Sequence, residues 1–207
     1  VDGLIRVLSY IGIALPAFVV AVLLLLLFGY VWPVLPVLGR LSSGVAAPPT
    51  ITGLYVLDGL LTGNFKAAGD AALHLILPAF ALALGPIVQD ARVLRSALGD
   101  NMGKEYMLVS TGYGLPSNLL MRKYLLRPSA TPVITVMGLD FASLMGQAFL
   151  VEKIFNWPGL SRYGINSMLS KDLNAISAVI IIIGIIFLIV NLVVDLIMAA
   201  LDPRIRL

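Results

Sequence analysis

The sequence predicts an all-α protein that crosses a membrane several times. Hydrophobic residues make up 59% of the 207 residues, charged residues only 12%, and the mean hydropathy is +1.00. Soluble domains carry about twice that share of charged residues, so this chain could not cover a globular exterior with polar side chains. Disordered chains have the opposite composition, poor in hydrophobic residues and rich in charge. The composition therefore excludes both a soluble globule and a disordered chain.

Four apolar stretches are long enough to cross a bilayer as helices, because a hydrocarbon core of about 30 Å needs about 20 helical residues. The predicted spans cover residues 7–30, 71–97, 131–151 and 176–201. The first contains an unbroken leucine run, Leu23 to Leu27, and the fourth is the most apolar. Pro78 and Pro86 interrupt the second span, where we expect a static kink rather than a hinge. We treat residues 1–207 as one transmembrane domain.

The basic residues predict the orientation of these spans. Nine basic residues fall on one side of the predicted spans: Arg6, Arg92, Arg95, Lys104, Arg122, Lys123, Arg127, Arg204 and Arg206. The other five fall on the opposite side: Arg40, Lys66, Lys153, Arg162 and Lys171. Because loops rich in Lys and Arg stay in the cytoplasm, both termini and residues 98–128 are predicted to be cytoplasmic. The net charge of +3 is dispersed, so we expect a lipid bilayer and no nucleic acid as the partner of these charges.

The connecting segments differ in character. Residues 31–70 are rich in Pro, Gly, Ser and Thr and predict irregular structure; residues 152–175 contain the turn sequence Asn156-Trp157-Pro158-Gly159. Residues 98–128, which we call the inner loop, predict two short helices with a bend at Gly112 and Gly114. Pro116 suits the first turn of the second helix.

Two functions are open for the inner loop from its residues alone. A basic amphipathic helix after a glycine bend suits docking against a soluble partner or against anionic headgroups. The alternative is a connector that only lies on the lipid surface.

Polar residues inside the spans also leave two interpretations open. Asp140 and Gln147 are seven residues apart on the third span and so lie on nearly the same helical face. They would line a polar substrate path, or they would form hydrogen bonds between helices. Asn191 and Asp195 share a face of the fourth span and are expected to be structural, as is His74, the only histidine.

Enzymatic functions find little support in the sequence. There is no cysteine, and no metal or cofactor is expected. Asp140 and Asp195 would suit an intramembrane aspartyl protease, but the glycine and tyrosine that should accompany them are missing. The segment from Gly99 to Lys104 lacks the glycine spacing and the Ser/Thr of a phosphate loop. The chain is therefore not expected to bind ATP.

A set of short motifs, in order along the chain, resembles a known transporter family. These motifs are Lys104-Glu105-Tyr106, Gly114-Leu115, Arg127-Pro128, Thr131-Pro132-Val133, Phe155-Asn156-Trp157-Pro158-Gly159, Asn191-Leu192-Val193-Val194-Asp195 and Leu201-Asp202-Pro203-Arg204. They are similar to binding-protein-dependent ABC transporter permeases, most of all to the branch for dipeptides, oligopeptides and nickel. The chain resembles the C-terminal two-thirds of such a subunit, with the fold of a type I ABC importer permease core.

The resemblance implies a role for the inner loop. Residues 105–117 would form the coupling helix that fits a cleft on an ATPase subunit. The residues placed at that contact are Glu105, Gly112, Gly114, Leu115 and Ser117. The chain departs from the general family at Leu108-Val109-Ser110, where three small residues are usual, and at Gly112, where alanine is usual.

The resemblance also implies partners and a location. A second, related permease subunit would complete the pathway, two cytoplasmic ATPase subunits would drive it, and an extracytoplasmic solute-binding protein would deliver the solute. The whole would sit in the inner (plasma) membrane and import peptides. Nickel or sugars are alternative solutes, and a membrane scaffold that transports nothing is an alternative of another class.

Overall fold

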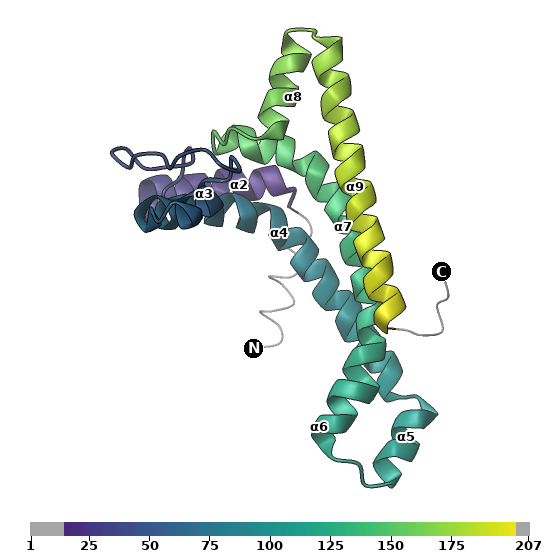
Figure 1. Ribbon diagram of the computed structural model, residues 1–207. Helices are drawn as coiled ribbons and strands as arrows, with labels where there is room; N and C mark the ends of the chain where they lie inside the picture. The colour runs from purple at the N-terminus through teal and green to yellow at the C-terminus, as the bar shows by residue number, and fades with distance from the viewer. Residues whose placement is uncertain (1–14, 202–207) are drawn as a thin grey trace. The chain divides into compact units, whose positions relative to one another are not determined.

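The computed structural model describes residues 15–201, and within them every regular element is a helix. In chain order these elements are α2 (Ala17–Leu26), η1 (Leu27–Val31), α3 (Tyr55–Leu61), α4 (Phe65–Met102), α5 (Glu105–Gly112), α6 (Ser117–Leu119), η2 (Leu120–Leu126), α7 (Arg127–Ile154), α8 (Leu160–Leu169) and α9 (Leu173–Leu201) (Figure 1). The predicted all-α fold is confirmed.

Three of the helical stretches are long and apolar enough to cross a membrane: Phe65–Met102, Ser117–Ile154 and Leu173–Leu201. They contain the second, third and fourth predicted spans. The first predicted span, residues 7–30, is described only from residue 15, as the shorter apolar helix Ala17–Val31. The expectation of a fourth span therefore stays a prediction.

The chain divides into two compact units. Unit 1 comprises Val1–Gly85 and Leu144–Ile180, and unit 2 comprises Pro86–Ser143 and Ile181–Leu207. The long helices α4, α7 and α9 each contribute to both units.

The core of unit 1 brings α2, α4 and the end of α7 together. Ala17, Val20 and Ala21 of α2 are buried with Leu77 and Ala81 of α4 and with Val151 and Phe155 at the end of α7. Several of these residues are small, and small side chains let membrane helices approach closely.

Residues 31–70 are more ordered than the predicted irregular structure. They contain α3 and the first turns of α4, which begins at Phe65. The carboxylate of Asp58 accepts hydrogen bonds from the backbone N–H groups of Thr52 and Gly53, at 2.7 and 3.0 Å. These bonds fold the preceding turn over the start of α3, a pairing that composition does not reveal. Residues 152–175 likewise contain α8 after the predicted turn at residues 156–159.

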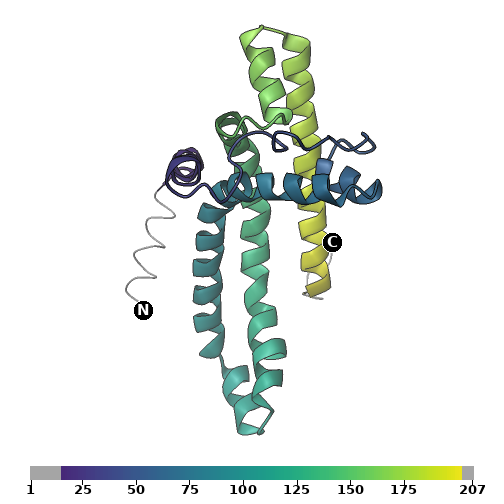
Figure 2. The ribbon, with the colours of Figure 1, turned by 90° about the vertical axis from the view of Figure 1, so that its left-hand side faces the viewer.

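Unit 2 contains the inner loop and the helix ends that carry it. Figures 1 and 2 both show α5 and α6 as a short hairpin that joins the end of α4 to the start of α7. In the same unit α7 packs closely on α9, since a Cβ built on Gly138 would lie 3.2 Å from a methyl carbon of Val194.

Candidate functional site

The bend of the inner loop is a left-handed turn at Gly114. Its φ of +69° is a backbone conformation that side chains with a Cβ rarely adopt. The N–H of Gly114 donates to the carbonyl oxygen of Thr111 at 3.0 Å and closes the turn after α5. Gly112 is the last residue of α5 and shows no positive φ. The predicted bend is thus at Gly114 alone.

The other residues predicted for ATPase contact lie on the same hairpin. Glu105 is the first residue of α5 and Ser117 the first of α6, directly after Pro116; both are exposed. Leu115 is half-buried between the two helices. Whether these residues contact another protein remains a prediction.

Large apolar side chains stand exposed around the bend. Leu108 is 69% exposed, Val109 56% and Tyr113 81%. A cluster of exposed apolar side chains is costly in water, and such clusters are a feature of surfaces that contact another molecule. The sequence did not single out Tyr113, although its place beside a turn glycine could have suggested it.

A chain of hydrogen bonds holds the base of the hairpin. The hydroxyl of Tyr106 donates to Asn101 Oδ1 at 3.2 Å, and Asn101 Nδ2 donates to Ser129 Oγ at 2.9 Å. Ser129 Oγ in turn donates to the carbonyl oxygen of Ala97 at 3.2 Å. Asn101 and Ser129 are both buried, so this chain ties α4, α5 and α7 together. Sequence reasoning missed it, because the partners are 28 residues apart.

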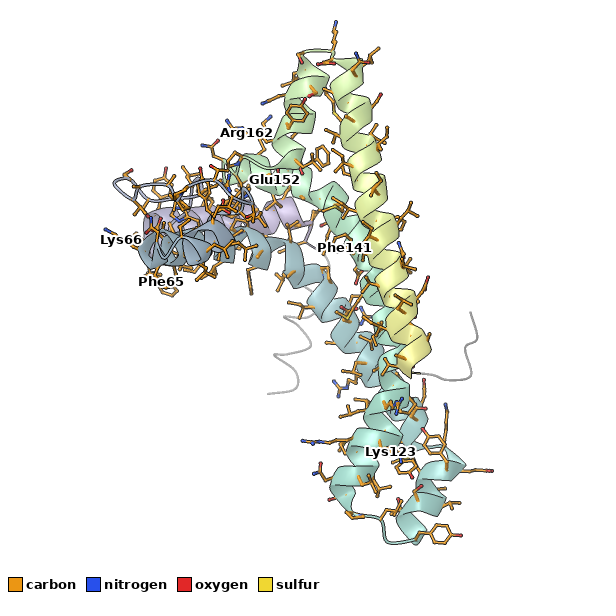
Figure 3. All side chains as sticks on the ribbon, viewed as in Figure 1. Phe65, Lys66, Lys123, Phe141, Glu152 and Arg162 are labelled. Atoms are coloured by element: carbon orange, nitrogen blue, oxygen red, sulfur yellow. The ribbon has the colours of Figure 1, made fainter. Side chains whose placement is uncertain are left out.

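A cavity of about 460 Å³ lies beside this base. We call it the inner-end cavity. Its polar lining consists of Asn101, Lys104, Tyr106, Lys123, Tyr124, Arg127 and Thr131, and its apolar lining of Pro128 and Leu201, the latter at the end of α9. Figure 3 shows the side chains of this region, with Lys123 labelled.

Asp140, the predicted lining residue of the third span, has polar neighbours on α4. Gln89 Nε2 donates to Asp140 Oδ1 at 3.4 Å. One further carboxylate oxygen of Asp140 and one of Asp90 are buried without a hydrogen-bond partner among residues 15–201. Sequence reasoning did not predict a role for Gln89 and Asp90. They follow the apolar part of the second span, and a polar pair at such a position is itself a sign of a functional site. Gln147 belongs to unit 1, and its role in a lining remains a prediction.

Unit 1 holds a second polar cluster, around Arg40. The Arg40 guanidinium lies 3.7 Å from the centre of the Tyr55 ring and donates from Nη2 to the carbonyl oxygen of Gly53 at 2.6 Å. The ring of Trp157 lies 5.9 Å away. These contacts fix the loop before α3 against the turn after α7.

The carboxyl of Asp58 and the imidazole of His74 are both engaged within unit 1. The Thr52 hydroxyl, 2.7 Å from Asp58 Oδ1, is the main cause that lowers the pKa of Asp58, and backbone N–H groups add to it against the opposing effect of burial. His74 is buried, with Nδ1 2.8 Å from the carbonyl oxygen of Asp70. That is the environment expected of a structural histidine. Within residues 15–201 no three metal-ligating side chains of the His, Asp or Glu type come together.

Comparison with known proteins places these features in a family. The profile described as "Binding-protein-dependent transport system inner membrane component" matches residues 1–207. The chain is 36% identical over 204 residues to the probable D,D-dipeptide transport system permease protein DdpB of Escherichia coli strain K12, covering 99% of this chain and 60% of that protein.

Two further relatives are also named as permease proteins of transport systems. The dipeptide transport system permease protein DppB of Alkalihalophilus pseudofirmus is 33% identical over 99% of this chain and 61% of its own length. The glutathione transport system permease protein GsiC of Shigella flexneri is 34% identical over 79% of this chain and 55% of its own length. The chain thus spans about 60% of the length of the first two relatives.

Proposed function

This chain belongs to the family of inner membrane components of binding-protein-dependent transport systems, and on that premise we propose that it is a permease subunit of an ABC importer for peptides. It would form half of the transmembrane pathway, and a second, related permease subunit would form the other half. ATP hydrolysis would take place on separate cytoplasmic subunits.

The observation that carries this proposal is the exposed apolar tip of the inner loop on a braced base. A loop that transmits force must be stiff where it joins the spans and open where it meets its partner. The hydrogen bonds from Tyr106 through Asn101 to Ser129 supply the first property. The exposed Leu108 and Tyr113 supply the second. Two ATPase subunits would dock on two such tips, one from each permease subunit, and their closure would rock the spans between two states.

The orientation follows from the charges. The inner loop carries Lys104, Arg122 and Lys123 with Arg127 directly after it, and basic loops stay in the cytoplasm. Both termini would lie on that same side, beyond the described residues. An extracytoplasmic solute-binding protein would then meet the segments that the charge pattern predicts for the other side, residues 31–70 and 152–175.

The names of the relatives support peptides as the transported solute. The names of the three relatives refer to D,D-dipeptides, dipeptides and glutathione. No observation favours nickel or a sugar over peptides. Asp140 and Gln147 are proposed to contribute to the polar lining of the path.

The docking of the inner loop can be tested by crosslinking. Because the chain contains no cysteine, one introduced cysteine gives it a single reactive thiol. A single Tyr113→Cys variant, assembled with its ATPase subunits, should form a crosslink to them with a short reagent that joins the new thiol to a lysine amine of the partner. Leu169→Cys is the matched control, because Leu169 is also a highly exposed apolar residue beside a turn, but near the start of α9. Crosslinking of Leu169→Cys but not of Tyr113→Cys would refute the docking assignment and the orientation together.

A further inference from the structure

We propose that the inner-end cavity binds the phosphate headgroup of an anionic phospholipid. This site is separate from the ATPase contact proposed at the tip of the inner loop.

The position of the cavity places it at the membrane boundary. Thr131 is the first residue of the third predicted span, and Leu201 is the last residue of the fourth. Asn101 lies at the end of α4, past the second span. The cavity is therefore bracketed by the ends of three helices, at the depth where phospholipid headgroups meet the hydrocarbon core.

The charge of the lining selects an anion. Lys104, Lys123 and Arg127 line the cavity, and none of the described residues that line it is acidic. Basic pockets between the cytoplasmic ends of membrane helices are suited to anionic headgroups. The hydroxyl groups of Tyr124 and Thr131 add hydrogen-bond donors to the same wall.

Several of these side chains are already held in place. Arg127 donates from Nε and Nη2 to the carbonyl oxygens of Leu201 and Ala200, each at 3.3 Å. Those two bonds use two of the five N–H donors of a guanidinium, so the charged group is oriented and keeps further donors for a phosphate. The Lys123 ammonium lies 5.8 Å from the centre of the Tyr124 ring. Tyr106 is fixed by its hydrogen bond to Asn101. Binding at a preorganised site costs less conformational entropy.

Size and surroundings favour a lipid over a free ion. The volume of about 460 Å³ falls within the range of pockets that hold small organic molecules, and it exceeds what one phosphate group needs. Along α9, within two turns of Leu201, Leu196 and Ile197 are exposed apolar side chains. They offer acyl chains an apolar surface on the same helix as Leu201, which lines the cavity.

The test measures lipid retention by the full chain, purified in non-ionic detergent without ATP or other subunits. Native mass spectrometry would compare phosphatidylglycerol with phosphatidylcholine of the same acyl chains. The expected result is one tightly retained phosphatidylglycerol. Replacing both lysines, K104Q with K123Q, should weaken its binding about twenty-fivefold, at about fivefold for each lysine near a membrane surface.

The matched control is R95Q with R122Q. Arg122 lies beside Lys123 on η2, and Arg95 lies on α4, nine residues before Lys104. Both arginines carry the same charge as the lysines, but neither lines the cavity. This control should retain the lipid. Equal loss in the two double variants, or equal retention of both lipids by the unaltered chain, would overturn the proposal in favour of a diffuse electrostatic attraction.

Two further outcomes are decisive. Displacement of phosphatidylglycerol by glycerol phosphate at equal concentration would show a site for small phosphate esters and overturn the lipid assignment. If K104Q with K123Q leaves lipid retention unchanged but abolishes binding of the ATPase subunits, the cavity faces an acidic protein surface, and the proposal is wrong. Should the double variant not fold, K123Q alone is measured for the fivefold loss. None of these measurements depends on transport, so their failure leaves the proposed permease function untouched.

Discussion

Arg127 at the start of α7 donates a hydrogen bond from Nε to the carbonyl oxygen of Leu201, the last residue of α9, across 74 positions of the chain. The last four carbonyl groups of a helix have no partner within the helix, and a cation there also complements the helix dipole. Arg127 therefore supplies donors to the last two described carbonyl groups of α9 and links that helix to the end of the inner loop.

Replacing Arg127 with Met should loosen the last turn of α9. The substitution keeps much of the apolar length of the side chain but removes the donors. We expect a loss of about 1 kcal/mol in local stability, because these bonds to a charged group are exposed. Hydrogen exchange of the amides of residues 196–201 should become about fivefold faster, while the amides of α8 should not change. Unchanged exchange at the end of α9 would contradict this role.

Substitutions of Gly114 separate the cost of an unfavourable backbone φ from the cost of a steric clash. No atom of the described part of the chain lies within 4 Å of a Cβ built on Gly114, so the cost of a side chain there comes from φ. Gly114→Val should strain the turn by about 1–2 kcal/mol, and Gly114→Asn should be tolerated better, because Asn adopts positive φ more readily.

The measurement for Gly114 is transport-coupled ATPase activity in the reconstituted complex. We expect it to be lost in Gly114→Val and largely kept in Gly114→Asn. Gly112→Ala is the control, since Gly112 ends a helix in open space and alanine favours helix by up to about 1 kcal/mol. Normal coupling in Gly114→Val would refute the assignment of this turn as the mechanical contact.

The hydrogen-bonded base of the hairpin should be sensitive to single truncations. Ser129→Ala leaves the buried Asn101 amide without its acceptor, which should cost about 1–3 kcal/mol. Asn101→Ala should cost a similar amount, and the double variant should cost less than the sum, because the two residues act on the same bonds. Thermal unfolding in detergent measures all three. Ser117→Ala, at an exposed position, should change stability by less than about 0.5 kcal/mol.

The lowered pKa of Asp58 predicts that the stability of unit 1 depends on pH. This pKa is lowered below the ordinary value of 3.8, first by the Thr52 hydroxyl. A carboxyl with a depressed folded-state pKa stabilises the fold fully above its unfolded pKa, and that contribution is lost as the pH falls through the folded value. Unit 1 should therefore lose stability below about pH 4.

The matching variant is Asp58→Asn, which removes the titrating group. It should be less stable than the unaltered chain at pH 7, since its amide turns an N–H donor toward a backbone N–H. It should also show a weaker decline below about pH 4. Thermal unfolding between pH 3 and 7 measures both effects, with Asp100→Asn, an exposed position, as control. An identical pH profile in Asp58→Asn and the unaltered chain would contradict this account.

Much of the fold could be predicted from apolar length alone. The second, third and fourth spans were predicted at residues 71–97, 131–151 and 176–201, and the helices that contain them run several residues further at one or both ends. Those extensions are polar or mixed in composition, as at Phe65 to Asp70 and Gly99 to Met102. A hydropathy pattern reports where a helix meets lipid, not where its hydrogen bonding stops.

The candidate site divides in the same way. The inner loop, its bend near Gly114 and the second helix after Pro116 follow from residue types whose backbone preferences are strong. The hydrogen bonds of Asn101 with Ser129 and of Gln89 with Asp140 could not be predicted from residue types, because each joins residues 28 or more positions apart. Pairings at such separation depend on how the helices pack.

By itself, the sequence determined that this protein is helical, that it lies in a membrane and that its basic inner loop turns at a glycine. Those properties depend on the free energy of moving apolar groups out of water and on local backbone sterics, both of which act residue by residue. Only the tertiary structure decided which polar groups meet: the braced base of the loop, the basic cavity beside Leu201, and the single carboxylate of Asp58 that folds a turn over α3. A buried polar group must find a partner wherever packing provides one, and packing is a property of the whole chain.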